Sequence, residues 1–260
     1  GFGIKNDSMA GYSTYLQAVV TVFMILFGVN FNFYFLLMKK GKQAIHSEEV
    51  RAYFLIILTA VLLIAVNIRG YFDHFWQAVH QSAFQVGSII TTTGYATTDF
   101  NLWPEFSRTI LVLLMFVGAC AGSTGGGIKV SRILIMLKTV KKEVVQLLHP
   151  KSIKKIQLDG KAVEHEVVRS TNVFLIAYLL IFICSVLLVS LDNKDLVTTF
   201  TAVAATLNNI GPGLGEAGPL GNFSGFSNFS KLVMTFDMLA GRLELFPLLL
   251  LFMRSTWKKF

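Results

Sequence analysis

The sequence predicts an all-α integral membrane protein that contains a repeated structural unit. Hydrophobic residues make up 53% of the 260 residues and charged residues only 15%, against about 25% in ordinary soluble proteins. Long, nearly charge-free runs occur at 14–38, 53–67, 171–191 and 232–253, and about 20 apolar residues are enough to cross a bilayer. The third observation is an internal repeat, described below. A buried soluble core is the disfavoured alternative.

The basic residues are distributed unevenly along the chain. Most of the 23 Lys and Arg fall in 39–51, 129–169 and 254–259, so these three segments should be cytoplasmic. Contact with anionic lipid then explains the net charge of +8 without a nucleic-acid partner. The two cysteines, Cys120 and Cys184, lie in apolar segments, which favours packing over a disulfide.

The repeat has a period of about 118 residues. Each unit begins with a long apolar helix, near Arg51 in one copy and near Arg169 in the other. A half-length helix follows, then a short loop of small residues, a polar outer loop and another long helix. The half-length helices are 75–89 and 196–207, and the loops after them are 91–95 and 208–213.

The half-length helices predict re-entrant hairpins. Their 12–15 residues cover about 18–22 Å, which is too short to cross a bilayer. Each lies between two full spans whose outer ends share one side, so it should enter the membrane and return. Backbone without helical hydrogen bonds survives at that depth only where it lines a polar cavity or is buried in protein. The loops at 91–95 and 208–213 are therefore predicted to face water or ions.

The first of these loops, Thr-Thr-Thr-Gly-Tyr at 91–95, has groups suited to holding a cation. It offers successive carbonyls, three hydroxyls and a glycine that can adopt positive φ. Rings of such oxygen dipoles replace the hydration shell of a cation without any fixed negative charge, and the carboxyl end of the preceding helix adds a partial negative charge. The alternative is a threonine-rich helix cap at the membrane interface, and repetition at matched spacing favours the ion site.

A glycine-rich segment interrupts the helix that begins near Phe106. Five of the ten residues at 118–127 are glycine, each costing roughly 1 kcal/mol in a helix relative to alanine. The break falls about 18 Å into the helix, inside the bilayer. We expect an intramembrane loop that obstructs a pore and moves to open it. Its candidate residues are Gly118, Gly122, Ser123, Thr124, Gly125, Gly126 and Gly127.

Two other interpretations of the glycine-rich segment exist. Close helix packing through small residues would also use this composition. A phosphate-binding loop is disfavoured, because the pattern G-x-x-x-x-G-K-[ST] is not met before Lys129 and no strand precedes it.

Arg242 lies well inside the last apolar run. An isolated charge there costs at least ~2.5–3.5 kcal/mol on insertion scales. We expect its side chain to face an aqueous pore against carbonyls of the 118–127 loop, where it would raise the barrier to cations. A structural salt bridge between helices is the alternative. The charged segment 138–169 is interpreted as a solvated cytoplasmic linker or as the docking site of a cytosolic regulator.

The two loops resemble a known family. "TTTGYATTDF" at 91–100 and "NNIGPGLG" at 208–215 resemble the third and fourth filter elements of the Trk/Ktr/HKT potassium-transporter superfamily, especially its bacterial TrkH type. "GFGIKND" at 1–7 is similar to the end of the second element. The resemblance implies helix–pore-loop–helix units around a pseudo-fourfold cation pore. It also implies filter glycines at Gly1, Gly94 and Gly211, with potassium bound by carbonyls of Thr92, Thr93, Asn209 and Ile210.

The same resemblance sets the expected domain boundaries. Residues 1–50 would be the tail of the second pore repeat (filter end and outgoing helix), 51–148 the third repeat with its broken helix, 149–168 a cytoplasmic linker and 169–260 the fourth repeat. The chain would then be a fragment of a longer protein. The fourth loop departs from the pattern, with Asn-Asn-Ile-Gly-Pro at 208–212. One glycine per loop suggests a shorter filter with fewer ion sites.

The function implied is potassium uptake, with K⁺ as the transported ion and no organic cofactor. The family further implies a multi-pass protein of the bacterial cytoplasmic membrane, a homodimer, and a cytosolic ring of nucleotide-binding regulatory subunits. The alternative is a non-conducting membrane anchor or scaffold for such a regulator. An intramembrane enzyme is disfavoured, because the sequence shows no set of acid, base and nucleophile.

Overall fold

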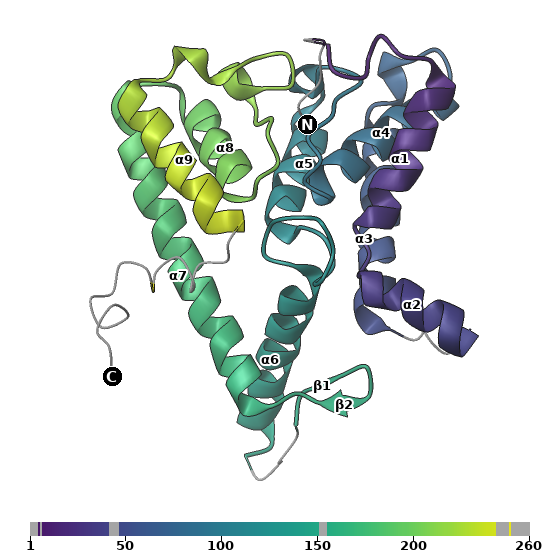
Figure 1. Cartoon of the computed structure of the whole chain (residues 1–260), viewed down its shortest axis with the longest axis vertical. Helices are drawn as coiled ribbons and strands as arrows, with labels where there is room; N and C mark the ends of the chain where they lie inside the picture. Colours follow the sequence, from purple (N-terminus) through teal and green to yellow (C-terminus); the bar gives the residue numbers. More distant parts are fainter. Residues whose placement is uncertain (1–4, 6, 42–46, 151–154, 243–249, 251–260) are drawn as a thin grey trace.

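The computed structural model describes residues 5, 7–41, 47–150, 155–242 and 250. Within these ranges the regular secondary structure is helical apart from one short antiparallel hairpin (Figure 1). The helices are α1 (Thr14–Phe27), α2 (Phe31–Lys40), α3 (Glu48–Asn67), α4 (Phe75–Ile90), α5 (Glu105–Val117), α6 (Val130–Leu148), α7 (His165–Val189), α8 (Leu196–Leu207) and α9 (Asn228–Arg242). The strands are β1 (Gln157–Leu158) and β2 (Lys161–Ala162). Short 3₁₀ turns are η2 (Arg69–Tyr71), η3 (Phe100–Leu102), η4 (Ser190–Asp192), η5 (Gly215–Ala217) and η6 (Phe223–Gly225).

The helices form two groups, which Figure 1 shows on either side of a central loop. One group contains α1, α3, α4 and α5, and the other contains α7, α8 and α9. Phe116 of α5 joins them, because its ring packs edge-on against Phe182 of α7 and also contacts Phe200 of α8. The loops that follow α4 and α8 thus belong to two groups of helices that are in contact through these aromatic rings.

Among the described residues, two helices are long and apolar enough to cross a membrane. They are Glu48–Asn67, with a mean hydropathy of 2.2, and His165–Asp192, with a mean hydropathy of 2.9. Each presents leucines outward, such as Leu55 and Leu180, which are 64% and 59% exposed. Apolar side chains exposed on helices of this length suit contact with lipid. The predicted all-α membrane fold is confirmed.

The apolar run at 14–38 differs from the single span that its length predicts. It forms α1 and α2, which meet at an angle of 84°. Asn30 starts the second helix, since its side-chain oxygen accepts from the N–H of Asn32 at 2.8 Å. Gly28 allows close packing at the bend, because a Cβ there would lie 2.1 Å from the Tyr53 hydroxyl. A polar cap and a tertiary contact therefore override the apolar length.

The half-length helices occur close to their predicted ranges. Helix α4 has 16 residues and α8 has 12, and α8 is buried throughout its second half, from Thr201 to Leu207. Two buried hydroxyls in that half are bonded within the helix: Thr201 Oγ1 donates to Val197 O at 2.7 Å, and Thr206 Oγ1 to Ala202 O at 2.9 Å. Bonding to the carbonyl four residues earlier lets threonine occupy a buried helix.

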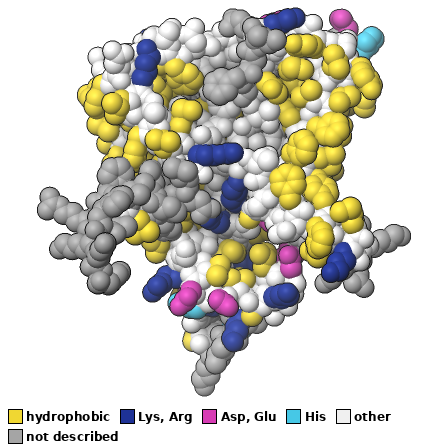
Figure 2. Space-filling view, viewed as in Figure 1, with side chains coloured by type: hydrophobic (Ala, Val, Ile, Leu, Met, Phe, Trp, Pro, Cys, Tyr) yellow, Lys and Arg dark blue, Asp and Glu magenta, His cyan; other side chains and the backbone are white. Residues whose placement is uncertain are grey.

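The surface reflects the same division between membrane and water. Figure 2 shows hydrophobic side chains on both flanks of the upper part, while many charged side chains gather toward the lower end. Helix α6 leads to that end, where Lys138 pairs with Glu48 at the start of α3. The Lys138 ammonium also donates to Gln157 O of β1, at 2.6 Å. The hairpin is thereby attached to the charged ends of the long helices.

Candidate functional site

The loops after α4 and α8 have the same backbone conformation. Thr92 and Asn209 lie in the left-handed region with φ of 55° and 56°. Two residues later, Gly94 and Gly211 also have positive φ, at 77° and 112°. Because L-residues rarely adopt this region, its occurrence at equivalent positions shows that the two loops are built alike.

Equivalent hydrogen bonds close both helices. The N–H after each left-handed residue reaches back five positions: Thr93 N to Ser88 O (2.9 Å) and Ile210 N to Ala205 O (2.8 Å). The side chain at each helix end also donates to the carbonyl four residues earlier: Thr91 Oγ1 to Gly87 O (2.7 Å) and Asn208 Nδ2 to Ala204 O (2.8 Å). These bonds satisfy carbonyls in the last turn of each helix, so the chain can leave the helix there.

The two loops meet at their glycines. A Cβ on Gly211 would lie 4.0 Å from the Cα of Gly94. Residues 92–95 and Asn209 are half-buried, and Gly211 is exposed. These two loops are far apart in the sequence, and the fold brings them face to face. Segments that line one shared ion path would have to be placed in this way.

The glycine-rich loop, residues 118–127, lies against the loops that follow α4 and α8. It begins at Gly118, which ends α5 with φ of 69°. The N–H of Gly126 donates to Thr92 Oγ1 at 2.8 Å. On the other side, a Cβ on Gly126 would lie only 2.5 Å from Asn208 O. No larger residue fits between the loops after α4 and α8 at this position without a shift.

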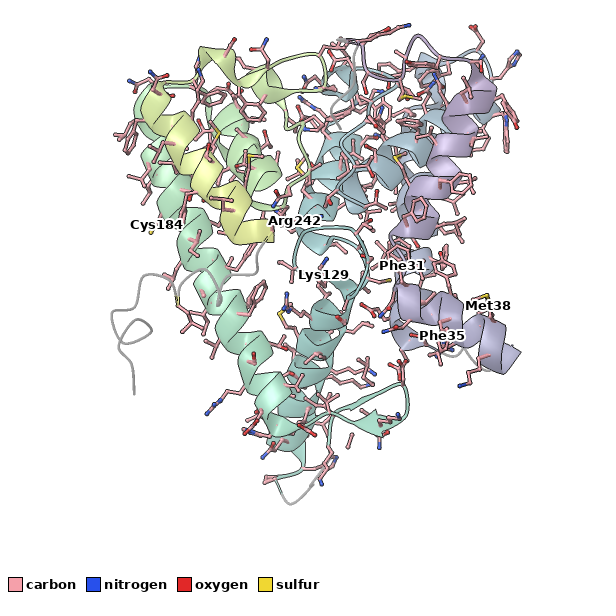
Figure 3. The ribbon with its side chains drawn as sticks, viewed as in Figure 1. Phe31, Phe35, Met38, Lys129, Cys184 and Arg242 are labelled. Atoms are coloured by element: carbon pink, nitrogen blue, oxygen red, sulfur yellow. The ribbon has the colours of Figure 1, made fainter. Side chains whose placement is uncertain are left out.

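Two cationic side chains bond to neighbouring carbonyls of this loop. Arg242, the last residue of α9, donates from Nη1 to Thr124 O at 3.0 Å. The Lys129 ammonium donates to Gly125 O. Figure 3 shows Arg242 approaching from α9 and Lys129 from the start of α6. A cavity of about 170 Å³ lies between them, bordered also by Tyr178.

The structure gathers most of the predicted site residues. Gly94 and Gly211 approach one another, and Thr92 and Asn208 contact the glycine-rich loop. That loop carries Gly118, Gly122, Ser123, Thr124, Gly125, Gly126 and Gly127. Ser123 Oγ donates to Cys120 O at 2.6 Å within it. Gly1 lies outside the described residues.

Glu49 belongs to this site but was not predicted from the sequence. Its carboxylate accepts from the N–H of Ala121 at 2.7 Å and of Ser131 at 3.1 Å, at the two ends of the glycine-rich loop. An acidic residue in the first turn of a helix is an ordinary feature, so no sequence signal distinguishes it. Only the packing of α3 beside the loop assigns it this position.

Comparisons with known proteins agree with this architecture. The profile of the TrkH family, described as "Cation transport protein", matches residues 1–259. The Trk system potassium uptake protein TrkH of Vibrio parahaemolyticus is 36% identical over 268 residues, which cover 99% of this chain and 54% of that protein. TrkH of Salmonella typhimurium is 34% identical over 260 residues, covering 98% and 53%.

A solved structure shares the fold. The crystal structure of the potassium transporter TrkH from Vibrio parahaemolyticus matches with a TM-score of 0.91 at 34% identity, over 99% of this chain and 56% of that chain. The chain thus spans about half the length of the curated relatives that it matches. Since the family profile covers nearly every residue, the chain belongs to the TrkH family of cation transport proteins.

Proposed function

We propose that this chain forms part of a membrane pore for potassium uptake. The observation that carries the proposal is the meeting of Gly94 and Gly211 at the ends of two half-length helices, with the glycine-rich loop packed against both pore loops. The relatives named potassium uptake proteins support K⁺ as the transported ion. Family membership favours transport over an enzymatic role.

The ion would be held by backbone oxygens. In this proposal, carbonyls of Thr92, Thr93, Asn209 and Ile210 replace part of the hydration shell of K⁺, as carbonyl rings do in cation filters. The carboxyl ends of α4 and α8 point at these loops and contribute partial negative charge. Gly1 would belong to a third, equivalent loop, in line with the proposed repeats at 1–50, 51–148 and 169–260.

The glycine-rich loop would act as the gate. It occupies the space beside Thr92 and Asn208, so ions leaving the filter would meet it. The positive φ angles of Gly118, Gly122 and Gly127 place its turns where glycine is the favoured residue. Arg242, bonded to the loop, would add an electrostatic barrier to cations.

The partners follow from the same proposal. The chain would lie in a bacterial cytoplasmic membrane as a multi-pass homodimer, with the lower, charged end of Figure 2 facing the cytosol. The 149–168 linker, which includes the β1–β2 hairpin, would lie near a ring of nucleotide-binding regulatory subunits.

The transport proposal is tested by measuring rubidium flux into proteoliposomes that contain the full-length protein. Gly94→Asp should reduce flux to the level of protein-free vesicles, because it fills the filter and adds a side chain at positive φ. Gly70→Asp is the matched control, since a Cβ at Gly70 meets nothing within 4 Å. Loss of flux in both variants, or in neither, would count against the proposed filter.

Arg242→Ala should raise rubidium flux by removing the barrier. Unchanged or reduced flux in protein that remains monodisperse would argue against this role. The competing function is a non-conducting anchor for a cytosolic regulator. It predicts that the unmodified protein shows no rubidium flux and that none of these substitutions changes this result.

A further inference from the structure

Glu49 holds both ends of the glycine-rich loop with one carboxylate oxygen. The side chain comes from the first turn of α3, and the residue is only 8% exposed. Its Oε1 accepts from Ala121 N, near the start of the loop, and from Ser131 N, in the first turn of α6. A single atom therefore joins α3 to both ends of the loop. The ends are also bonded to each other, for example through Val130 N–H and Ala119 O at 3.1 Å, and the carboxylate ties this pair of segments to α3.

The physical chemistry of this contact favours a docked loop. Glycine-rich backbone has many accessible conformations, so ordering it costs entropy. Hydrogen bonds to an ionised acceptor are stronger than neutral ones, and the amino-terminal turn of α6 is a favourable place for negative charge. If the loop left, the buried carboxylate would lose its donors, which is costly. Glu49 therefore opposes movement of the loop.

We infer that Glu49 is a positioning residue that holds the glycine-rich loop against the pore loops. The inference rests on the proposed function in one respect: if the chain conducts, Glu49 stabilises the closed state of its gate. The geometric part, that the carboxylate keeps the loop docked, does not depend on transport.

The chain provides a reporter for loop movement. Cys120 lies inside the loop and is fully buried, while Cys184 is exposed on α7, where Figure 3 labels it. The Cys120 N–H donates to Gly28 O at 3.0 Å, so the thiol is carried by the docked backbone. In protein whose other cysteines are replaced by serine, the rate at which a small methanethiosulfonate reagent modifies Cys120 measures how often the loop opens.

Removal of the carboxylate should raise this rate. Glu49→Ala is expected to accelerate modification of Cys120 about tenfold or more, the range for losing hydrogen bonds to a charged group. Glu49→Gln keeps an acceptor oxygen without the charge and should accelerate it only a few-fold. Glu48→Gln is the matched control, since Glu48 lies in the same turn but pairs with Lys138. It should leave the rate unchanged.

A second reporter separates loop opening from unfolding. Ala78 is fully buried in α4, so Ala78→Cys, in a background without other cysteines, should stay unreactive when Glu49 is replaced by alanine. If Glu49→Ala leaves the reaction rate of Cys120 unchanged, or if it makes both reporters reactive together, the positioning role is overturned.

Rubidium flux then distinguishes this inference from the transport proposal. A faster Cys120 reaction without flux in any variant would sustain the positioning role and reject conduction. Flux that is normal in the unmodified protein, together with an unaltered Cys120 rate in Glu49→Ala, would sustain conduction and reject the positioning role.

Discussion

The loops after α4 and α8 share a backbone but differ in side chains. One reads Thr-Thr-Thr-Gly-Tyr at 91–95 and the other Asn-Asn-Ile-Gly-Pro at 208–212. Only glycine is common to both at an equivalent position, yet Thr92 and Asn209 have nearly identical φ angles of 55° and 56°. The helix ends and one glycine therefore set the conformation, and the remaining side chains are free to vary.

The side chains determine what each loop is attached to. In the first loop, Thr91 and Thr93 share a hydroxyl hydrogen bond of 2.8 Å, and Thr92 accepts from the glycine-rich loop. In the second, Asn208 accepts from the Tyr178 hydroxyl of α7 at 3.0 Å, and Asn209 Nδ2 donates to Met238 O of α9 at 3.0 Å. One loop is thus fastened to the proposed gate, and the other to the surrounding helices.

The largest expected difference between the loops is in the stability lost when the residue at the buried end of each helix is replaced. Asn208→Leu removes the partner of the Tyr178 hydroxyl and should cost about 3 kcal/mol of stability, whereas Thr91→Val should cost about 1 kcal/mol. Thermal unfolding of the full-length protein in detergent measures both. Adding Tyr178→Phe to Asn208→Leu should recover part of the loss, because no hydroxyl is then left unpaired. If the two substitutions lower the stability equally, the proposed difference in how the two loops are held is wrong.

A smaller difference is expected at the two glycines. Gly211 has φ of 112° and Gly94 of 77°, and the second value is nearer the left-handed region that an L-residue tolerates. Gly211→Ala should therefore cost about 2 kcal/mol and Gly94→Ala about 1 kcal/mol. Gly70→Ala serves as the control with open surroundings. If alanine costs more at Gly94 than at Gly211 in the same unfolding measurement, the backbone comparison fails.

The smallest effect concerns the contact between the first loop and the glycine-rich loop. Thr92→Val removes the acceptor for Gly126 N–H and should cost about 1 kcal/mol. Rubidium flux should rise as the proposed gate loosens. Thr235→Val is the matched control, since the Thr235 hydroxyl is exposed and bonds within α9, to Lys231 O. A response identical to that control would show that the contact does not hold the gate.

Structural elements that depend on neighbouring residues could be located from the sequence. The half-length helices and the break at 118–127 were predicted close to their observed positions, because helix length and glycine content act on neighbouring residues. The expected partner of Arg242 was also located in the correct segment, since a charge at that depth needs nearby carbonyls. The roles assigned to these residues in the filter and the gate stay predictions.

By itself, the sequence determined that this is a helical membrane protein with two half-length helices, since hydropathy and length decide which segments leave water. Tertiary structure decided the rest. The bend at Gly28 depends on Tyr53, the approach of Gly211 to Gly94 depends on how two helix groups pack, and the placement of Glu49 depends on α3 lying beside the loop. Each is a contact between residues distant in the chain, which no local pattern specifies because its energy exists only after folding.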